Sequence, residues 1–306
     1  MTIGRNTAWL SDNAIRRAMT WAVIFAVSWA LLEVSLGAEL RSPFNLLQIV
    51  WCRYATHLVI CLLLWGWRRP TALWKTSRPT LHLSRSFLML IMPSAFMLSV
   101  HLGIAAEFVW SVFWITPALI IALAGLFLKE SPPPVAVVAS IAGYFAAAAT
   151  IGHPWPPSLT ALVLALIVTG SFSVYVVMTR SLRDEAVEAN LFYTAVCPFV
   201  ALSPFMPGIW LAPDGHDTIV LMAIGAVGFV SLLALDHACR SAPLWSSANA
   251  LFAQAFCVAG LVYGLLGVRP SLHVLLGMAV LLATIAFLWV RAGRFAVPAH
   301  SAPSQV

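Results

Sequence analysis

Charged side chains lie inside segments that are otherwise apolar enough to cross a membrane. Arg53 and His57 interrupt the run IVWCRYATHLVICLLLWG (residues 49–66), and Glu33 lies in the apolar segment before it. An arginine in the middle of a spanning helix costs about 2.5 to 3.5 kcal/mol on insertion scales. Such charges are therefore expected to pair with one another or to serve a function.

The depths of Glu33 and Arg53 favour a pair between them. The helical rise places Glu33 roughly 8 Å and Arg53 roughly 10 Å below the outer ends of two helices joined by a short loop. We predict this ion pair ahead of a direct contact between Arg53 and a substrate. Alternatively, Arg53 extends toward the outer headgroups and fixes the register of its helix. His57, His101 and Glu107 could join Arg53 in a polar outer vestibule, although satisfied interior histidines are the favoured interpretation.

Aromatic, hydroxyl and amide side chains recur on the apolar segments and could bind a small solute. Tryptophan faces attract an ammonium group, and an asparagine or glutamine would be costly if it faced lipid. Tryptophans near span ends are also common interface anchors, and serines within spans often pack helices together. The predicted substrate-binding residues are Trp29, Glu33, Arg53, Trp110, Ser111, Trp114, Ser171, Tyr175, Asn249 and Gln254.

The composition indicates an integral membrane protein. Of the 306 residues, 61% are hydrophobic and 9% are charged, and the mean hydropathy is +0.92. A soluble protein lacks the polar residues to cover so much apolar surface, whereas a bilayer solvates it. The net charge of +6 includes no basic cluster interleaved with aromatics, so no nucleic-acid partner is expected. The five cysteines show no metal-ligand spacing, and neither a metal nor another cofactor is expected.

Ten apolar segments are long enough to span a bilayer as helices. Three prolines in the seventh segment predict a kinked or broken helix. Lysines and arginines near the segment ends fall mainly on one side, which predicts a multi-pass protein of the cytoplasmic (inner) membrane with both termini cytoplasmic. The segments are residues 18–38, 46–67, 84–103, 107–128, 134–151, 158–179, 189–211, 217–236, 243–264 and 271–291.

Five spans in each half would place two related halves in opposite orientations. Such an inverted repeat has its binding site at the interface of the halves, near the middle of the bilayer. We predict an all-α integral membrane protein with ten helices in a 5+5 inverted repeat. The predicted units are a first five-helix repeat over residues 1–152, a second over 153–296 and a cytoplasmic tail over 297–306.

The fourth segment carries a family resemblance. TPALIIALAGLFLKES, with Pro117 thirteen residues before Glu130, resembles a signature of the EamA-type transporters of the drug/metabolite transporter superfamily. QIVWCRYA around Arg53 and LSRSFLMLI in the third segment also resemble that family. The resemblance implies a central cavity lined by spans 1, 3, 4, 6, 8 and 9, with spans 5 and 10 as scaffold. In the second half, Val268 and Ala255 stand where the acid and the proline of the signature would lie.

Three residues are candidates for a gate or hinge. Pro93 and Pro117 interrupt helical hydrogen bonding, and such breaks commonly act as hinges. Glu130 has two interpretations of equal weight, either an inner gate or a solvated charge at a helix end. Asp236 and Arg240 are spaced i, i+4, which predicts a surface ion pair of little energetic weight.

The leading hypothesis is a secondary transporter that exports a small amino-acid-like or zwitterionic metabolite by alternating access. It is not expected to be an enzyme, and its partners are the metabolite and membrane lipid, with protons or the solute gradient as the energy source. Uptake or exchange by the same fold is the first alternative. A lipid-acting enzyme would need a catalytic group such as Asp236, His237 and Cys239, which point in different directions on a helix. A non-transporting scaffold or sensor, and a homodimer, are further alternatives.

Overall fold

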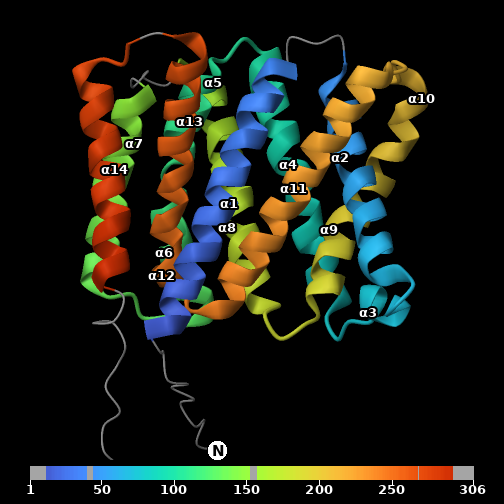
Figure 1. Cartoon of the computed structure of the whole chain (residues 1–306), viewed down its shortest axis with the longest axis horizontal. Helices are drawn as coiled ribbons and strands as arrows, with labels where there is room; N and C mark the ends of the chain where they lie inside the picture. The colour runs from blue at the N-terminus through green and yellow to red at the C-terminus, as the bar shows by residue number, and fades with distance from the viewer. Residues whose placement is uncertain (1–11, 40–43, 152–156, 268, 292–306) are drawn as a thin grey trace, which may run out of the picture.

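The computed structural model describes residues 12–39, 44–151, 157–267 and 269–291, and all regular secondary structure within them is helical. Ten candidate membrane spans confirm the predicted all-α class and the predicted number of spanning segments. Figure 1 shows the helices side by side, with the short α3 (Pro70–Trp74) at one end of the bundle. The spans are α1 (Asp12–Glu39), α2 (Leu46–Cys61) with η1 (Leu62–Gly66), α4 (Pro79–His101), α5 (Ala106–Phe113) with α6 (Thr116–Leu128), α7 (Pro134–Ile151), α8 (Leu159–Ser181), α9 (Val187–Leu202) with η2 (Ser203–Phe205) and α10 (Met206–Ile209), α11 (Gly215–Ser241), α12 (Leu244–Ser247) with η3 (Ala248–Leu251) and α13 (Phe252–Leu266), and α14 (Leu272–Arg291).

Local capping explains where several helices begin. The Asn45 side chain accepts a hydrogen bond from the backbone N–H of Leu47 at the start of α2. Ser158 caps α8 in the same way by accepting from the N–H of Ala161. Each cap satisfies a backbone donor that has no partner within the helix. A proline at the first or second position starts α4 and α6, where its missing N–H costs nothing.

Three helices extend beyond the predicted segments, and α1 and α11 do so past charged side chains. α1 begins at Asp12 instead of residue 18, and Asp12 pairs with Arg16 one turn later. α4 begins at Pro79 instead of residue 84, and α11 continues to Ser241 instead of residue 236. A helix ends where its backbone hydrogen bonding ends, and an internally paired charge does not end it. Arg85 and Asp236 therefore lie inside helical spans.

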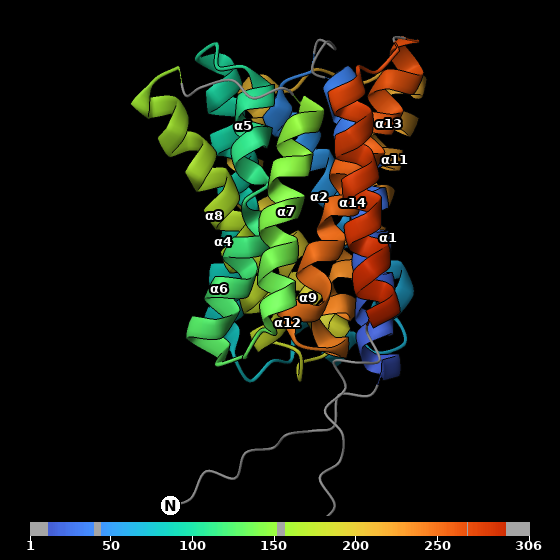
Figure 2. The ribbon, with the colours of Figure 1, turned by 90° about the vertical axis from the view of Figure 1, so that its left-hand side faces the viewer.

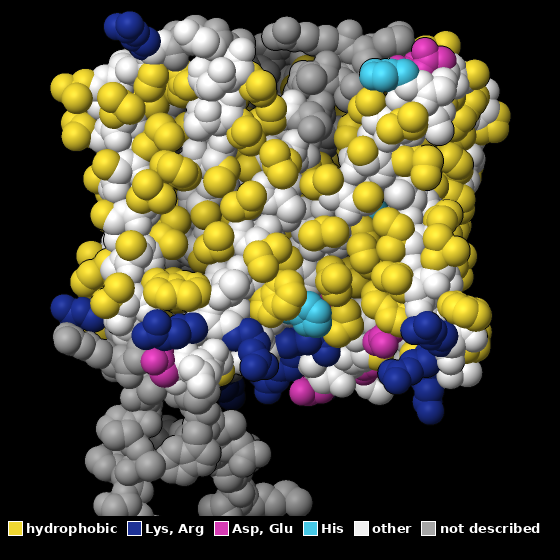
Figure 3. Space-filling model, in the orientation of Figure 1, with side chains coloured by type: hydrophobic (Ala, Val, Ile, Leu, Met, Phe, Trp, Pro, Cys, Tyr) yellow, Lys and Arg dark blue, Asp and Glu magenta, His cyan; other side chains and the backbone are white. Residues whose placement is uncertain are grey.

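The two described ends of the chain, at Asp12 and Arg291, lie at the same end of the bundle, which is called the inner end below (Figure 1). Lys and Arg side chains gather at this end on the face that Figure 3 shows, below a broad hydrophobic band. The short α12 and α3 lie at the inner end, and α10 lies at the opposite, outer end.

Helix neighbours repeat between the two halves of the chain. α1 packs on α11 and α13, and five spans later α8 packs on α4 and on α5 and α6. α2 packs on α9 and α11, whereas α9 packs on α2 and α4. Counted five spans along the chain, α1 corresponds to α8, α2 to α9, α4 to α11, and the fourth span to the ninth. Each contact between two of these helices therefore also occurs between the two corresponding helices.

The fifth and tenth spans, α7 and α14, form a close pair at one edge of the bundle (Figure 2). A Cβ added at Gly277 would lie 2.7 Å from the backbone oxygen of Ala146. Small residues allow such backbone approach between membrane helices. This packing agrees with the scaffold role that the family resemblance implies for these spans.

Helix breaks occur in the fourth, seventh and ninth spans. The fourth span is divided between Phe113 and Thr116, and Pro117 lies in the first turn of α6, as predicted. The seventh span changes from α9 to a 3-10 turn and then to α10, which confirms the predicted interruption. α4, by contrast, continues through Pro93 as one helix.

Candidate functional site

Arg53 lies near the middle of the bundle and is surrounded by aromatic rings. Its side chain is 6% exposed, and its guanidinium carbon lies 4.9 Å from the centre of the Trp29 ring and 5.4 Å from that of Tyr54. Among the described residues, its buried Nε and Nη2 atoms have no hydrogen-bond partner. A desolvated guanidinium is attracted to ring faces, but rings do not neutralise its charge.

The predicted ion pair between Glu33 and Arg53 is wrong. The Glu33 carboxylate instead accepts a 2.8 Å hydrogen bond from Nε2 of Gln254 on α13, and none of the ion pairs between described residues joins Glu33 to Arg53. The Arg53 guanidinium lies against Trp29, which is one turn closer to the inner end than Glu33. Gly228 on α11 makes room for it, because a Cβ there would lie 2.7 Å from Arg53 Nε.

Aromatic side chains from three spans form a continuous wall beside Arg53. The Trp29 ring lies 6.1 Å from Phe172 on α8, and Phe172 lies 5.5 Å from Phe113 on α5. Phe113 in turn lies 5.5 Å from Trp114, whose indole nitrogen is buried and has no partner among the described residues. The wall thus connects Trp29 to Trp114 through Phe172 and Phe113.

Other predicted binding residues serve local packing. Asn249 donates to the Ala136 backbone oxygen at 2.9 Å and accepts from the Ser140 hydroxyl at 2.8 Å, so its amide joins η3 to α7. The Ser111 hydroxyl donates to its own helix, to the Phe108 oxygen at 2.7 Å. Trp110 packs on Phe96 and Phe113, and Ser171 is buried on α8.

His57 does not belong to an outer vestibule. It lies one turn closer to the inner end than Arg53, is 2% exposed, and meets the rings of Tyr54 and Phe229 at 5.4 and 6.0 Å. A Cβ at Gly228 would lie 2.9 Å from its Nε2 atom. His57 is therefore an interior neighbour of Arg53, which agrees with the interior interpretation.

Arg85 is a buried residue that the sequence predicted only as an inner-side positive charge. It is 1% exposed and lies inside α4. Its guanidinium donates to Thr179 Oγ1 at 3.1 Å and to Thr194 Oγ1 at 2.7 Å, and also to the Asn190 backbone oxygen. The guanidinium carbon lies 5.1 Å from the ring of Tyr175, another predicted binding residue. The signal in the sequence was an arginine with apolar residues on its C-terminal side in LSRSFLMLI.

Glu130 forms a largely buried ion pair at the inner end of the bundle. Its Oε1 accepts from Arg180 Nε at 3.1 Å, and its Oε2 accepts from the backbone N–H of Leu244 at 2.7 Å. Burial raises the pKa of Glu130 above its ordinary value, although Arg180 opposes that shift. The pair links the ends of α6 and α8 to the start of α12, so Glu130 makes a helix-end contact and is not a freely solvated charge.

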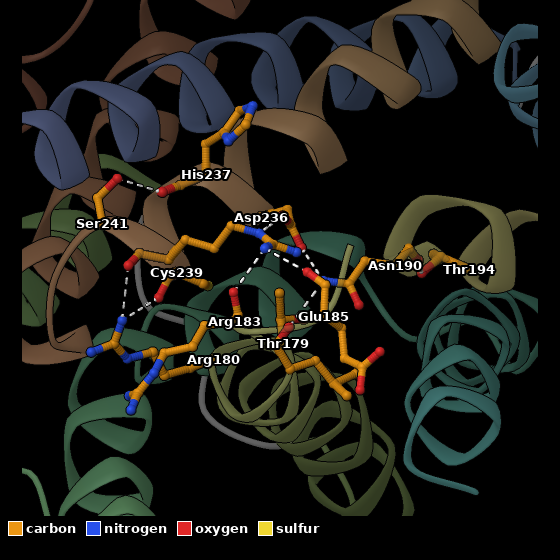
Figure 4. A network of polar contacts seen from close by, with 12 residues as sticks. Thr179, Arg180, Arg183, Glu185, Asn190, Thr194, Asp236, His237, Cys239 and Ser241 are labelled. Carbon is orange, nitrogen blue, oxygen red and sulfur yellow. Dashed lines mark hydrogen bonds and ion pairs between the residues drawn. The ribbon is translucent and has the colours of Figure 1, made fainter. Parts of the chain in front are cut away.

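Asp236 and Arg240 belong to a larger polar network and not to an exposed pair (Figure 4). Asp236 is 2% exposed, pairs with Arg240 and accepts a 2.6 Å hydrogen bond from Asn190 Nδ2. Arg240 also donates to the backbone oxygens of Arg183 and Glu185, each at 2.7 Å. Arg180 donates to the Cys239 oxygen at 2.7 Å. The prediction of a surface pair is wrong, because α11 continues past Asp236 and carries it into contact with α9.

A small cavity lies at the inner end, between α1, α7, α12 and α14. Its volume is about 10 Å³, room for roughly one water molecule. It is lined by Ile15, Met19, Ala136, Trp245, Ser246 and Leu288. The rings that surround Arg53 do not line this cavity.

One exposed group has side chains that metals favour. Asp214, His216 and Asp217 place their ligand atoms within 4.8 Å of one another at the outer end. The two aspartates form the capping box of α11, with Asp214 accepting from the Asp217 N–H at 2.7 Å. Helix capping accounts for this arrangement.

Comparison with known proteins gives a match in structure alone. No protein-family model matches the sequence, and no curated protein matches it. A solved structure, described as the crystal structure of a protein, superimposes with a TM-score of 0.74 over 91% of this chain and 98% of that chain. The two sequences are 15% identical, so the likeness shows the fold alone. This chain is a multi-pass membrane protein with ten candidate spans.

Proposed function

We propose that this protein is a secondary transporter of a small zwitterionic, amino-acid-like metabolite, of the EamA type within the drug/metabolite transporter superfamily. The observation that carries the proposal is the Arg53 guanidinium, which lies in the middle of the bundle beside Trp29 and whose buried Nε and Nη2 atoms have no partner among the described residues. An intramembrane charge without a partner is a candidate functional site by default.

The side chains around Arg53 suit the two charges of such a metabolite. A guanidinium binds a carboxylate through parallel hydrogen bonds, and the Nε and Nη2 atoms of Arg53 are available for this geometry. The Glu33 carboxylate, held by Gln254 one turn beyond Trp29, and the Trp29 ring itself would attract an ammonium group. The predicted binding residues Trp114 and Tyr175 would contribute to the walls, whereas Asn249 would support them from outside.

The repeated helix neighbours support an inverted repeat of five and five spans. In such repeats the substrate lies between the halves, and one half rocks against the other. The Arg53 region has this position, because α1 and α2 meet α11 and α13 of the second half there. Helix breaks in the fourth span, at the aromatic wall, and in the ninth span would allow the movement.

The inner end would be the cytoplasmic side, since Lys and Arg gather there. Both termini would then be cytoplasmic in the inner membrane. The Glu130–Arg180 pair and the Asp236 network close this end, so loading of a metabolite from the cytoplasm requires them to separate. Export is the proposed direction, with the solute gradient or protons as the source of energy.

A ligand panel on the purified protein tests the proposal. The melting temperature is measured with each protein amino acid and with its decarboxylated amine and its amide. A bound ligand stabilises by mass action, so at least one amino acid should raise the melting temperature whereas its amine and amide should not. Arg53→Gln should lose the effect, and the matched control Arg16→Gln, at an exposed ion pair, should keep it.

Two outcomes would contradict the proposal. If no amino acid stabilises the wild-type protein, the substrate class is wrong. If an amino acid stabilises wild type and Arg53→Gln equally, Arg53 does not bind its carboxylate.

A further inference from the structure

Arginine side chains within the helical spans differ in their counterions. Arg180 pairs with Glu130 and Arg240 pairs with Asp236. For Arg53 and Arg85, no carboxylate of the described residues lies within ion-pair distance. Arg85 is the more buried of the two, at 1% exposed against 6%.

The partners of Arg85 leave its positive charge uncompensated. They are two threonine hydroxyls and one backbone oxygen, all of them neutral. The buried Nε atom has no partner in the described part of the chain, and neither has Oδ1 of the adjacent Asn190. Desolvating a guanidinium costs several kcal/mol in real proteins, and a nearby anion offsets that cost better than neutral oxygens do.

Aromatic residues connect Arg85 to Arg53. Arg53 lies over the Tyr54 ring, and the Tyr54 hydroxyl donates to the backbone oxygen of Met89, one turn from Arg85 on α4. Arg85 lies over the Tyr175 ring. Each of the two guanidinium groups therefore lies over a tyrosine ring, Arg53 over Tyr54 and Arg85 over Tyr175.

The two arginines lie at different depths. Arg85 is six residues from the start of α4, roughly 9 Å from the inner end of the bundle. Arg53 is thirteen residues from the end of η1, roughly 20 Å from the same end. His82, one turn closer still to the inner end, is fully buried, and neither of its ring nitrogens has a partner among the described residues. Unpartnered polar groups thus continue inward from Arg53 through Arg85 to His82.

We propose that Arg85 is a second anion-binding station, which holds the carboxylate of the transported metabolite between the cytoplasm and Arg53. This inference rests on the proposed function. A solute loaded at the inner end meets Arg85 first and passes the tyrosines to reach Arg53. Thr179, Thr194 and the Asn190 carbonyl hold the guanidinium in place, and its Nε atom binds the carboxylate once the inner end opens.

Flux measurements from each side of the membrane test the second station. A uniformly ¹⁴C-labelled mixture of the protein amino acids is supplied to inside-out vesicles, which load from the inner face, and to right-side-out vesicles, which load from the outer face. The variants are Arg85→Gln and Arg85→Lys, with Arg16→Gln as the exposed control. The concentration of the mixture that gives half-maximal flux is measured in each case.

For Arg85→Gln, half-saturation from the inner face should rise about tenfold or more, as expected when a hydrogen bond between charged groups is lost. Half-saturation from the outer face, where the solute meets Arg53 first, should change less than about twofold on the same energy scale. Arg85→Lys should restore part of the inner-face affinity, because it keeps the charge without the fork geometry.

The outcomes separate this inference from the proposed function. Equal changes at both faces, or none at either, would show that Arg85 only joins helices, and would leave the transporter proposal intact. Absence of saturable flux in wild type would overturn both. If Arg85→Gln does not fold, Arg85→Lys and Thr194→Val carry the test, since both keep a buried cation and should show a smaller loss that is again confined to the inner face.

Discussion

The Arg53 guanidinium and the Trp29 ring, 4.9 Å apart, hold together the first and second spans where the two halves of the chain meet. The sequence suggested Glu33 as the partner of Arg53, yet Glu33 binds Gln254. No carboxylate of the described residues therefore pairs with Arg53, and the proposed function assigns this role to the carboxylate of the metabolite.

Gly228 provides the space that Arg53 occupies. A Cβ at this position would lie 2.7 Å from Arg53 Nε, 2.9 Å from His57 Nε2 and 3.1 Å from Leu32. Gly228→Ala should therefore lower the melting temperature, since overpacking costs about 1–3 kcal/mol. It should also weaken stabilisation by the amino-acid panel. Gly170→Ala is the control, because nothing lies within 4 Å of its added Cβ. Equal behaviour of the two variants would contradict the close packing of Gly228 on Arg53.

Glu33 is the carboxylate nearest the proposed ammonium position. If protons are coupled to transport, Glu33→Gln should flatten the dependence of flux on pH, because the variant cannot take up a proton. Glu33→Asp, which keeps a titratable group, should retain that dependence. Flux is measured in proteoliposomes across the physiological range of pH. An unchanged profile in Glu33→Gln would remove the coupling role and leave the solute gradient as the driving force.

Glu130 should make thermal stability depend on pH. Burial raises its pKa above 4.5, against the opposing effects of Arg180 and Arg183. A raised pKa means that the folded state binds the proton more tightly than the unfolded state. The stability from this group is thus fully present below pH 4.5 and is lost as the pH rises through the raised value.

Glu130→Gln does not titrate, so it isolates this contribution. The melting temperature of wild type minus that of Glu130→Gln should fall as the pH rises across that window. A difference that increases with pH would show that pairing with Arg180 outweighs burial. The Asp12→Asn variant, at an exposed ion pair, serves as the control for general effects of pH.

Asn249 should matter for stability and not for affinity. Both ends of its amide bind α7, through Ala136 and Ser140. Asn249→Ala should destabilise by about 1–3 kcal/mol, since it removes two hydrogen bonds between η3 and α7, each worth about 0.5–1.5 kcal/mol. The stabilisation by a bound amino acid should be unchanged in this variant and reduced in Gln254→Ala. If Asn249→Ala loses the stabilisation by a bound amino acid, Asn249 contributes to ligand binding and the prediction is wrong.

The sequence was informative about the spans because a run of about 20 apolar residues has few alternatives to crossing a bilayer. The breaks at Pro117 and in the seventh span also followed from residue type, since proline removes a helical donor. Arg53, Glu33 and Gln254 were chosen for their cost in lipid, and Trp29 as a ring that attracts an ammonium group. Arg53 contacts Trp29, and Gln254 binds Glu33 one turn further along α1.

Other contacts depended on information that the sequence does not carry. Depth estimates placed Glu33 and Arg53 at one level but left open the directions of their side chains around the helix axes. Segments were ended near charged residues, which left Arg85 and Asp236 at the inner ends of their spans, Arg85 as an inner-side charge and Asp236 as a surface residue. Both have partners on helices about 45 to 110 residues away in the chain, such as Asn190 and Thr194.

Counterflow in proteoliposomes is the measurement that tests the transporter proposal most directly. Vesicles loaded with unlabelled amino acids are diluted into a trace of the ¹⁴C-labelled mixture. The account predicts transient accumulation of label with the wild-type protein, little with Arg53→Gln, and none in liposomes without protein. No accumulation with wild type, or equal accumulation with Arg53→Gln, would contradict it.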